Sequence, residues 1–308
     1  MNRHKPDGRK KRAQNKKKAK AKAAAERTEA LPSDPQPMMP FMEGPVEDIL
    51  DDSELGGFEM GETSAVRQAQ MIMYDAFEAP TRQKAMKLAW EALAVSPDCA
   101  DAYNLLAEAE EASRPEAALD LYRKGVAAGE RALGEEAFTA DVGHFWGLLE
   151  TRPYMRAREG VAQRLWSLGA REESVAHYWD MLRLNPNDNQ GIRYALMPAL
   201  IELGCDQDAE RLFGLYPDDC MAVWAYSRAL LDFRRLGDSS ATQKALKMAI
   251  EVNPHIPALL LGRKKMPRTM PEYCGFGDEN EAVLYVDGGM AAWQGTSGAL
   301  EWLAAKAK

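Results

Sequence analysis

The stretch MRAREGVAQRLWSLGAREESVAHYWDMLRLNP, residues 155–186, decides the fold. Apolar residues recur at helical spacing from Ala157 to Leu168, Gly169 interrupts the pattern, and a second apolar face runs from Val175 to Leu182. An Asn-Pro pair then ends the second helix. The stretch therefore predicts one helical hairpin.

A single hairpin cannot bury its apolar face alone, so similar units must flank it. Four further stretches show the same alternation of helical pattern and turn, namely 65–97, 100–134, 189–217 and 220–254. We therefore predict an all-α fold, a tetratricopeptide-like solenoid of helical hairpins over residues 64–308, with Thr63 or Ser64 as the first N-cap.

The segment between the second and third hairpins, residues 134–157, is too rich in apolar and aromatic residues for a solvent loop. It is expected to pack against the array through Phe138, Val142, Phe145, Trp146, Leu148 and Leu149.

Residues 1–63 differ from the rest in composition and are predicted to be a disordered, charged region. Residues 1–27 hold twelve Lys and Arg against two acidic residues, a charge of about +10, and almost no large apolar side chain. Residues 30–63 are rich in Pro and Met and hold nine acidic residues and no basic one, which is typical of a linker. Because the whole chain carries −8, the part after residue 27 carries about −18.

Composition limits the class of protein. The 308 residues are 46% hydrophobic, which is ordinary for a globular chain, and the four cysteines contain no CxxC pair that would indicate a zinc module. No apolar run reaches the length of a membrane helix, and the basic N-terminus lacks the apolar core of a secretory signal. We expect a cytoplasmic protein without membrane insertion, or a nuclear one if the source is eukaryotic.

The hairpins resemble the tetratricopeptide repeat, whose period is about 34 residues. The small residue typical of the second helix falls on Ala85, Ala118, Ser174 and Ala209. The position four residues later falls on Ala89 and then on the aromatic residues Tyr122, Tyr178 and Phe213. At the large first-helix position the agreement is partial. The fourth unit is shortened in its second helix, and the fifth has a lengthened turn.

The C-terminal part supplies a narrower resemblance. Residues 253–257 read NPHIP, residues 277–285 read GDENEAVLY, Trp293 follows, and residues 298–303 read GALEWL. These elements are similar to the end of the suppressor of tumorigenicity seven protein family. The similarity is best over these last sixty residues and covers residues 102–303 more loosely. The resemblance implies a helical-repeat fold and supplies no catalytic motif, and the membrane-spanning segments of its animal members have no counterpart in this chain.

No arrangement of residues predicts catalysis, a cofactor site or a metal site. His144 and His177 have no Cys or Glu at ligand spacing, and the acidic cluster Glu108, Glu110 and Glu111 is expected to be solvated. The stretch DGGMAAWQGTSG, residues 287–298, lacks the GK[ST] ending of a phosphate loop. We interpret it as the break between a helix from 279 to about 286 and a last helix capped by Thr296 or Ser297.

The predicted function is therefore binding at the protein surface. The chain is expected to be a non-enzymatic scaffold or adaptor that binds a peptide or protein on the concave face formed by the first helices. The repeat pattern places ten residues on that face: Arg67, Gln70, Tyr74, Asn104, Glu108, Arg156, Glu159, Gln163, Gln190 and Arg193. Its predicted partner-binding residues are Arg67, Tyr74, Asn104, Arg152, Tyr154, Arg156 and Arg193.

Guanidinium groups beside an aromatic ring suit acidic peptide segments. We therefore expect Arg156 and Arg193 to form a basic, solvated spot near Tyr154 that contributes little to stability. The chain's own acidic stretch 43–62 would dock there weakly. The alternative to a binding role is that these arginines only form ion pairs with neighbouring acidic residues.

The alternative function is an RNA- or ribosome-associated factor recruited through the basic tail, since a dense Lys/Arg run binds polyanions without a folded groove. Its candidate residues are Arg9, Lys10, Lys11, Arg12, Lys16, Lys17 and Lys18. Against this, the tail has no aromatic residue to stack on bases, and a tail that only aids solubility would read the same. The identity of any partner and the oligomeric state stay open.

Overall fold

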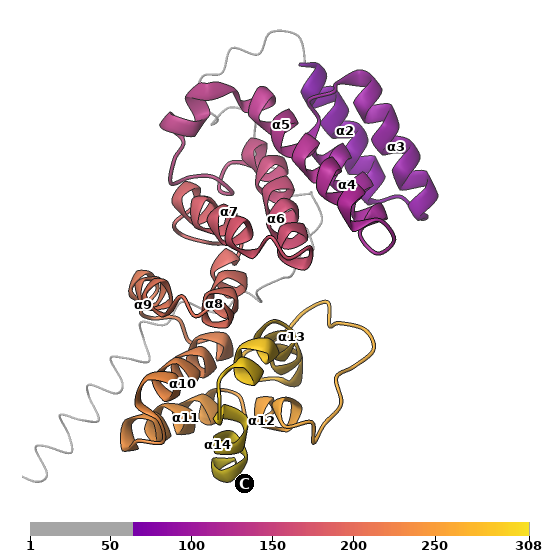
Figure 1. The fold of residues 1–308 in the computed structure, drawn as a ribbon. Coiled ribbons are helices and arrows are strands. Elements are labelled where there is room, and N and C mark those ends of the chain that lie inside the picture. Colours follow the sequence, from indigo (N-terminus) through magenta and orange to yellow (C-terminus); the bar gives the residue numbers. More distant parts are fainter. Residues whose placement is uncertain (1–63, 308) are drawn as a thin grey trace, which may run out of the picture. The chain divides into compact units, whose positions relative to one another are not determined.

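The structure, a computed structural model, describes residues 64–307, and every regular element in that range is helical (Figure 1). The predicted all-α fold is therefore confirmed. The predictions for the basic tail 1–27 and the acidic segment 30–63, including the docking of stretch 43–62, lie outside the described residues.

The described chain begins with a run of helical hairpins whose paired helices contact each other. These pairs are α2 (Ala65–Phe77) with α3 (Arg82–Val95), α4 (Ala100–Glu110) with α5 (Pro115–Ala140), α6 (Arg152–Ser167) with α7 (Arg171–Leu184), α8 (Ile192–Glu202) with α9 (Asp206–Leu215), and α10 (Ala222–Leu236) with α11 (Ser240–Val252). Ser64 is the N-cap of α2, as predicted, and its hydroxyl accepts a hydrogen bond from the Arg67 amide.

The hairpin that decided the fold turns at Gly169, whose φ of +88° lies in the left-handed region that favours glycine. Its first helix, α6, comes very close to α5. A Cβ at Gly160 would lie 2.3 Å from the Tyr122 ring, and a Cβ at Gly129 would lie 2.8 Å from the Cβ of Tyr154. Small residues at these two positions therefore set the distance between α5 and α6.

The segment before α6 packs against the array only in part. Phe145 is fully buried, and its ring lies 5.3 Å from that of Phe138 and 6.0 Å from that of Tyr154. Leu148 and Leu149, at the start of the 3-10 turn η2 (Leu149–Thr151), are exposed instead. The prediction that these two leucines cover the array is therefore wrong, because both side chains remain exposed to solvent.

The C-terminal part consists of α12 (Ile256–Leu260), α13 (Glu279–Gly295) and α14 (Ala299–Lys306). Asp278 caps α13 as predicted, since its carboxylate accepts from the Glu281 amide. The predicted break near residue 287 is wrong. The helix continues through Gly289, whose missing side chain lets the Tyr285 ring lie over it, and α14 is capped by Gly298 rather than by Thr296 or Ser297.

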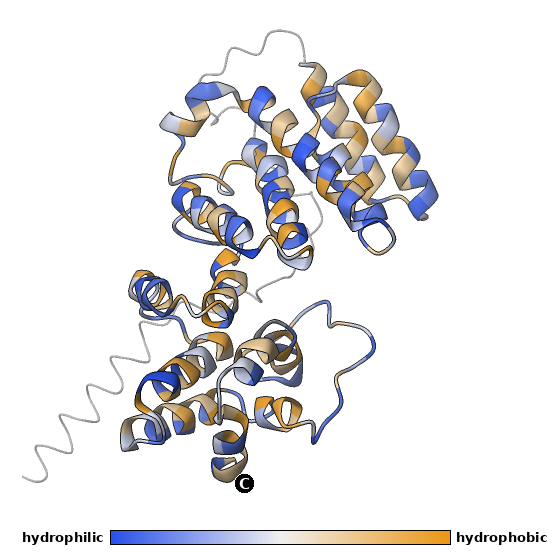
Figure 2. Cartoon of the chain, viewed as in Figure 1, coloured by the Kyte–Doolittle hydropathy of each residue, from blue (hydrophilic) through white to orange (hydrophobic). Residues whose placement is uncertain are grey.

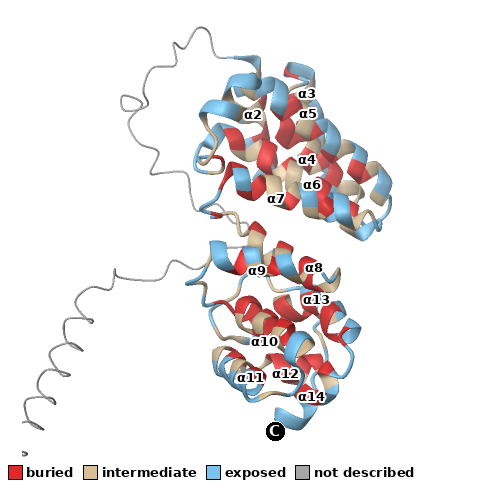
Figure 3. Cartoon of the chain, turned by 60° about the vertical axis from the view of Figure 1, so that its left-hand side comes forward, coloured by how far each residue is buried: buried red, intermediate tan, exposed pale blue. Residues whose placement is uncertain are grey.

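Burial follows the helix faces that touch one another. Figure 2 shows apolar and polar residues on different sides of individual helices, and Figure 3 shows the buried residues where neighbouring helices meet. The largest apolar cluster extends from Phe145 to Leu303, and separate clusters hold α2–α4 and the contact between α5 and α6.

Replacing Leu165 by Asp should lower the free energy of unfolding by about 4 kcal/mol, because it places an unpaired charge in an apolar contact. Leu165 is 2% exposed and lies in one cluster with Leu119, Tyr122 and Val161. Thermal unfolding of the full chain, followed by far-ultraviolet circular dichroism, measures the loss.

Leu236→Asp is the matched control, since Leu236 is 60% exposed at the end of α10. Its effect should stay within about 1 kcal/mol. Equal losses in the two variants would show that the assigned buried face of α6 is incorrect.

Candidate functional site

A buried carboxylate on α4 joins three first helices. Asp101 is fully buried, and it accepts hydrogen bonds from Arg156 of α6 through Nε at 2.9 Å and Nη2 at 2.5 Å. Gln70 of α2 donates to the same carboxylate at 2.8 Å, and Asn104 of α4 donates at 3.2 Å. One side chain thereby fixes the relative placement of α2, α4 and α6.

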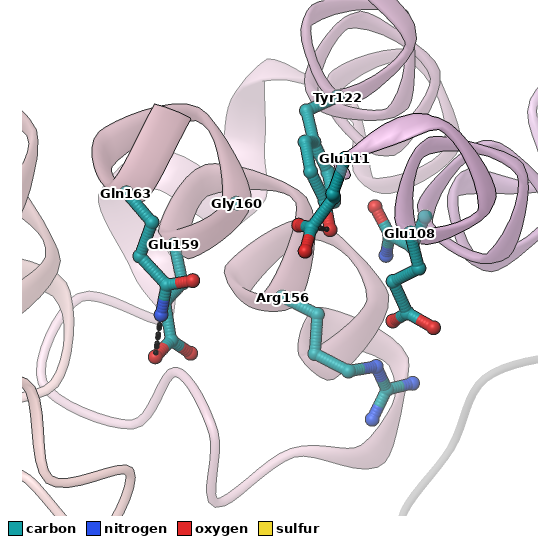
Figure 4. A pocket seen from close by; sticks show the side chains of 8 residues that line it. Glu108, Glu111, Tyr122, Arg156, Glu159, Gly160 and Gln163 are labelled. Carbon is teal, nitrogen blue, oxygen red and sulfur yellow. Dashed lines mark hydrogen bonds between the residues drawn. The ribbon is translucent and has the colours of Figure 1, made fainter. Parts of the chain in front are cut away.

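Next to this link lies a pocket of about 250 Å³ between α4, α5 and α6 (Figure 4). It is lined by Asn104, Glu108, Glu111, Tyr122, Arg156, Glu159, Gly160 and Gln163. Figure 4 shows the carboxylates of Glu108 and Glu111 on one side and Glu159 with Gln163 on the other. The pocket therefore gathers three carboxylates from two first helices.

The pKa of Glu108 is raised from its ordinary value to about 7. Partial burial is the main cause, and the negative charges of Glu111 and Asp101 add to it, while Arg156 and Arg82 act in the opposite direction. The side chain still reaches solvent at the mouth of the pocket. A carboxyl of this kind ionises more readily when a cation approaches.

The pKa of Glu159 is also raised, first by burial and then by the charge of Asp188. Two amides oppose this shift: Gln190 donates to Glu159 at 2.8 Å, and Gln163 donates at 3.0 Å. The third carboxylate, Glu111, accepts a hydrogen bond of 2.7 Å from the Tyr122 hydroxyl.

The prediction that Arg156 and Arg193 are solvated charges is wrong. The Arg156 side chain is 13% exposed and bidentate to Asp101. The Arg193 side chain is 15% exposed and pairs with two nearly buried carboxylates, Asp188 at 2.9 Å and Asp219 at 2.7 Å. Local pairing satisfies both guanidinium groups and cancels their charge, so the expected basic spot is not formed by these residues.

Arg193 is further enclosed by aromatic rings, since its guanidinium carbon lies 4.2 Å from the Tyr194 ring and 5.0 Å from the Tyr216 ring. Such stacking adds to an ion pair in a partly dry site. The cluster holds the beginning of α8 against the loop before α10 and is structural.

The other predicted partner-binding residues do not line the pocket. Tyr154 is 1% exposed and packs edge-on against Phe138, with ring centroids 5.0 Å apart, so the predicted contact between Tyr154 and a partner is wrong. Arg152 donates a hydrogen bond of 2.9 Å to the backbone carbonyl of Trp146, and its guanidinium lies over the indole ring of the same residue. Arg67 and Tyr74 are exposed on α2.

Asn104 and Arg156 are thus the predicted partner-binding residues that the structure brings together, and Glu108, Glu159 and Gln163 of the predicted face join them. Sequence reasoning missed Asp101 as their link and gave Tyr122 and Glu111 no part in the site. An Asp three residues before an Asn in the first turn of a helix was the available signal. The same pattern is equally consistent with an Asp in the first helical turn that only interacts with the helix dipole.

Among residues 64–307, no group of three or more His, Cys, Asp or Glu side chains is placed to hold a metal ion. The described helices also include none with both the length and the apolar composition needed to cross a bilayer.

Comparison with known proteins identifies the family. A family model described as ST7 protein matches residues 53–307. The chain belongs to the ST7 family. The match covers most of the chain and supports the predicted resemblance, and it begins further toward the N-terminus than the range 102–303 that the sequence indicated for this ST7 family member.

Individual ST7 relatives are distant and longer. The chain is 28% identical over 264 residues to the suppressor of tumorigenicity 7 protein-like of Gallus gallus. The aligned region covers 79% of this chain and 47% of the relative. It is also 28% identical over 238 residues to the suppressor of tumorigenicity 7 protein of Macaca fascicularis, covering 70% and 44% respectively. The chain therefore spans a little under half the length of these relatives.

Arg193→Gln should lower the free energy of unfolding of this ST7 family member by about 3 kcal/mol or more, because it leaves two buried carboxylates without their cation. Arg183→Gln is the matched control. Arg183 pairs with Asp180 at 2.6 Å on the surface, with its side chain 54% exposed, so its loss should cost about 1 kcal/mol at most.

Urea unfolding of both variants and the parent chain gives the two differences. Equal midpoints for all three proteins would show that Arg193 is a solvated charge, as the sequence alone predicts.

Proposed function

We propose that the chain is a non-enzymatic cytoplasmic scaffold or adaptor. Its binding face is formed by the first helices of the hairpins, α2, α4, α6 and α8, and its ligand is a peptide or protein segment. The observation that carries the proposal is the pocket between α4, α5 and α6, whose lining includes Asn104, Glu108, Arg156, Glu159 and Gln163 of the face that the repeat pattern selects.

The tetratricopeptide-like assignment is part of this proposal. In its favour, the small residues Ala118, Ser174 and Ala209 are fully buried where the repeat requires close packing. The aromatic positions four residues later, Tyr122, Tyr178 and Phe213, are buried as well. In arrays of this type the first helices line the inner surface, and that surface is a recurrent site for extended segments.

The rigidity of the face also supports a binding role. The Asp101 link holds Gln70, Asn104 and Arg156 in fixed positions, so little side-chain entropy remains to be lost when a segment binds. A polar surface that is already ordered before binding loses less entropy on binding, which favours affinity for a ligand.

Site-specific photocrosslinking in the native cell tests the proposal. A photoreactive residue in place of Gln163, which is exposed on α6 at the pocket, should give discrete crosslinked species. The matched control is the exposed Gln83 on α3, a second helix, which should not give those species.

The two positions carry the same original side chain and differ in the helix face that they occupy. Identical products from Gln83 and Gln163, or none from either, would contradict a scaffold that binds on its first helices.

A second candidate is an RNA- or ribosome-associated factor, which the composition of residues 1–27 favours. Twelve basic residues there stand beside a remainder of about −18, so polyanion binding would depend on the tail. In this form, the folded part repels nucleic acid and the tail alone supplies the affinity.

If the tail contacts six or more phosphates, affinity for single-stranded RNA should fall by about a thousandfold between about 50 and 200 mM salt. Fluorescence anisotropy with a labelled oligonucleotide measures this fall. Deleting residues 1–27 should abolish binding, and binding that persists in the deletion variant would reject the tail as the nucleic-acid site.

A further inference from the structure

The pocket between α4 and α6 has more hydrogen-bond acceptors than donors. Glu108 of α4, Glu111 at the C-terminal end of α4 and Glu159 of α6 face it (Figure 4). Among the described residues that line it, Arg156 is the cation, and it is bidentate to Asp101, so the charges of that pair cancel. Among the described residues Glu108 forms no hydrogen bond or ion pair, and Arg164 stands 3.7 Å from Glu111.

An unpartnered buried atom points to the same ligand chemistry. Asn104 lines the pocket and is 4% exposed. Its amide nitrogen donates to Asp101 and to the Pro153 carbonyl at 3.0 Å, which fixes the orientation of the side-chain amide. Within residues 64–307 its Oδ1 accepts no hydrogen bond. A buried acceptor left without a donor costs free energy, and a donor brought by a ligand would recover it.

The size and the donor set limit the ligand further. The volume of about 250 Å³ has room for a side-chain head group together with water. No set of side chains in the described range is arranged for a metal ion. A positive group that carries several N–H donors matches both the carboxylates and the amide oxygen.

We infer that this pocket takes the cationic end of a Lys or Arg side chain presented by the bound peptide or protein segment. The inference rests on the proposed scaffold function and supplies the chemistry of its partner. Glu108 and Glu159 bind the charge from two helices, and Asn104 Oδ1 accepts one of the N–H donors. This reverses the charge of the ligand expected from the sequence, because the arginines of the face are already paired.

The binding should depend on pH in a defined direction. A cation favours the ionised form of Glu108, whose pKa is about 7 without ligand, so affinity should weaken as pH falls below 7. The charged groups that face Glu108 are Asp101 on α4, Glu111 just after α4, Arg156 on α6 and Arg82 on α3. Ligand binding should in turn lower the pKa of Glu108.

The test uses n-butylguanidinium and n-butylammonium as head groups of Arg and Lys, titrated into the full chain at constant ionic strength. Carboxyl carbon shifts of isotope-labelled Glu side chains report occupancy, and Glu108→Gln assigns the Glu108 signal. At least one probe should shift Glu108 and Glu159 saturably, and the two arms decide between Arg and Lys. Tetramethylammonium, a cation without N–H donors, should bind more weakly than either probe.

Glu108→Gln combined with Glu159→Gln should raise the dissociation constant of the probe about tenfold or more, as expected for bonds between charged partners. Glu301→Gln, at an exposed position on α14, is the matched control and should leave it unchanged. Unchanged melting of the double variant separates a lost ligand contact from a lost fold.

The inference is overturned if neither probe saturates, or if the double variant binds as tightly as the parent chain. Failure of the probes while Gln163 still gives its crosslinked partner rejects the cation pocket and keeps the scaffold. Saturable probe binding without a crosslinked partner rejects the scaffold and keeps the pocket.

Discussion

The placement of α2, α4 and α6 depends on one buried carboxylate. Asp101 lies out of contact with solvent and is satisfied only because Gln70, Asn104 and Arg156 all donate to it. A buried charge that lost these donors would cost several kcal/mol, so the donors have little freedom to move. The same constraint that aligns the helices makes Arg156 unavailable as a free cation. It leaves the remaining carboxylates to set the character of the pocket.

Buried carboxylates recur further along the chain and have the same effect. Asp188 accepts from the amides of Ile192 and Arg193 at the start of α8. Glu281 of α13 accepts from the Ala222 amide at the start of α10 and from Asn253. Both acids lie near the beginning of a helix. Asp188 joins α8 to the loop that precedes it, and Glu281 joins the beginning of α13 to that of α10, which is distant in the chain. Polar links between helices thus supplement the apolar contacts of the fold.

The hairpins were predictable because their signals are local: the apolar spacing of α6 and α7, the turn at Gly169 and the cap at Ser64 can all be recognised within one turn of helix or a few. The pairing of the arginines was not predictable on those grounds. Arg156 meets an acid 55 residues away, and Arg193 meets one 26 residues away, and no local pattern selects those partners. For the same reason the helical stretch through Gly289 was missed, since the contact with the Tyr285 ring outweighs the low helix propensity of glycine. Residues of the pocket were partly identified, because the face they occupy follows from periodicity, but their net charge follows from tertiary pairing.

The close approach of α5 and α6 has a consequence for the order in which the chain folds. Gly125 and Gly129 in α5 and Gly160 in α6 permit that approach, yet each weakens its own helix by about 1 kcal/mol relative to alanine. These two helices therefore gain their stability from meeting each other rather than from their own sequences. Helix α3, with its Thr81 cap and alanine-rich interior, contains no glycine and has no such internal weakness. We expect α5 and α6 to become ordered in one coupled step, so that the pocket between α4, α5 and α6 exists only once that part of the chain has folded.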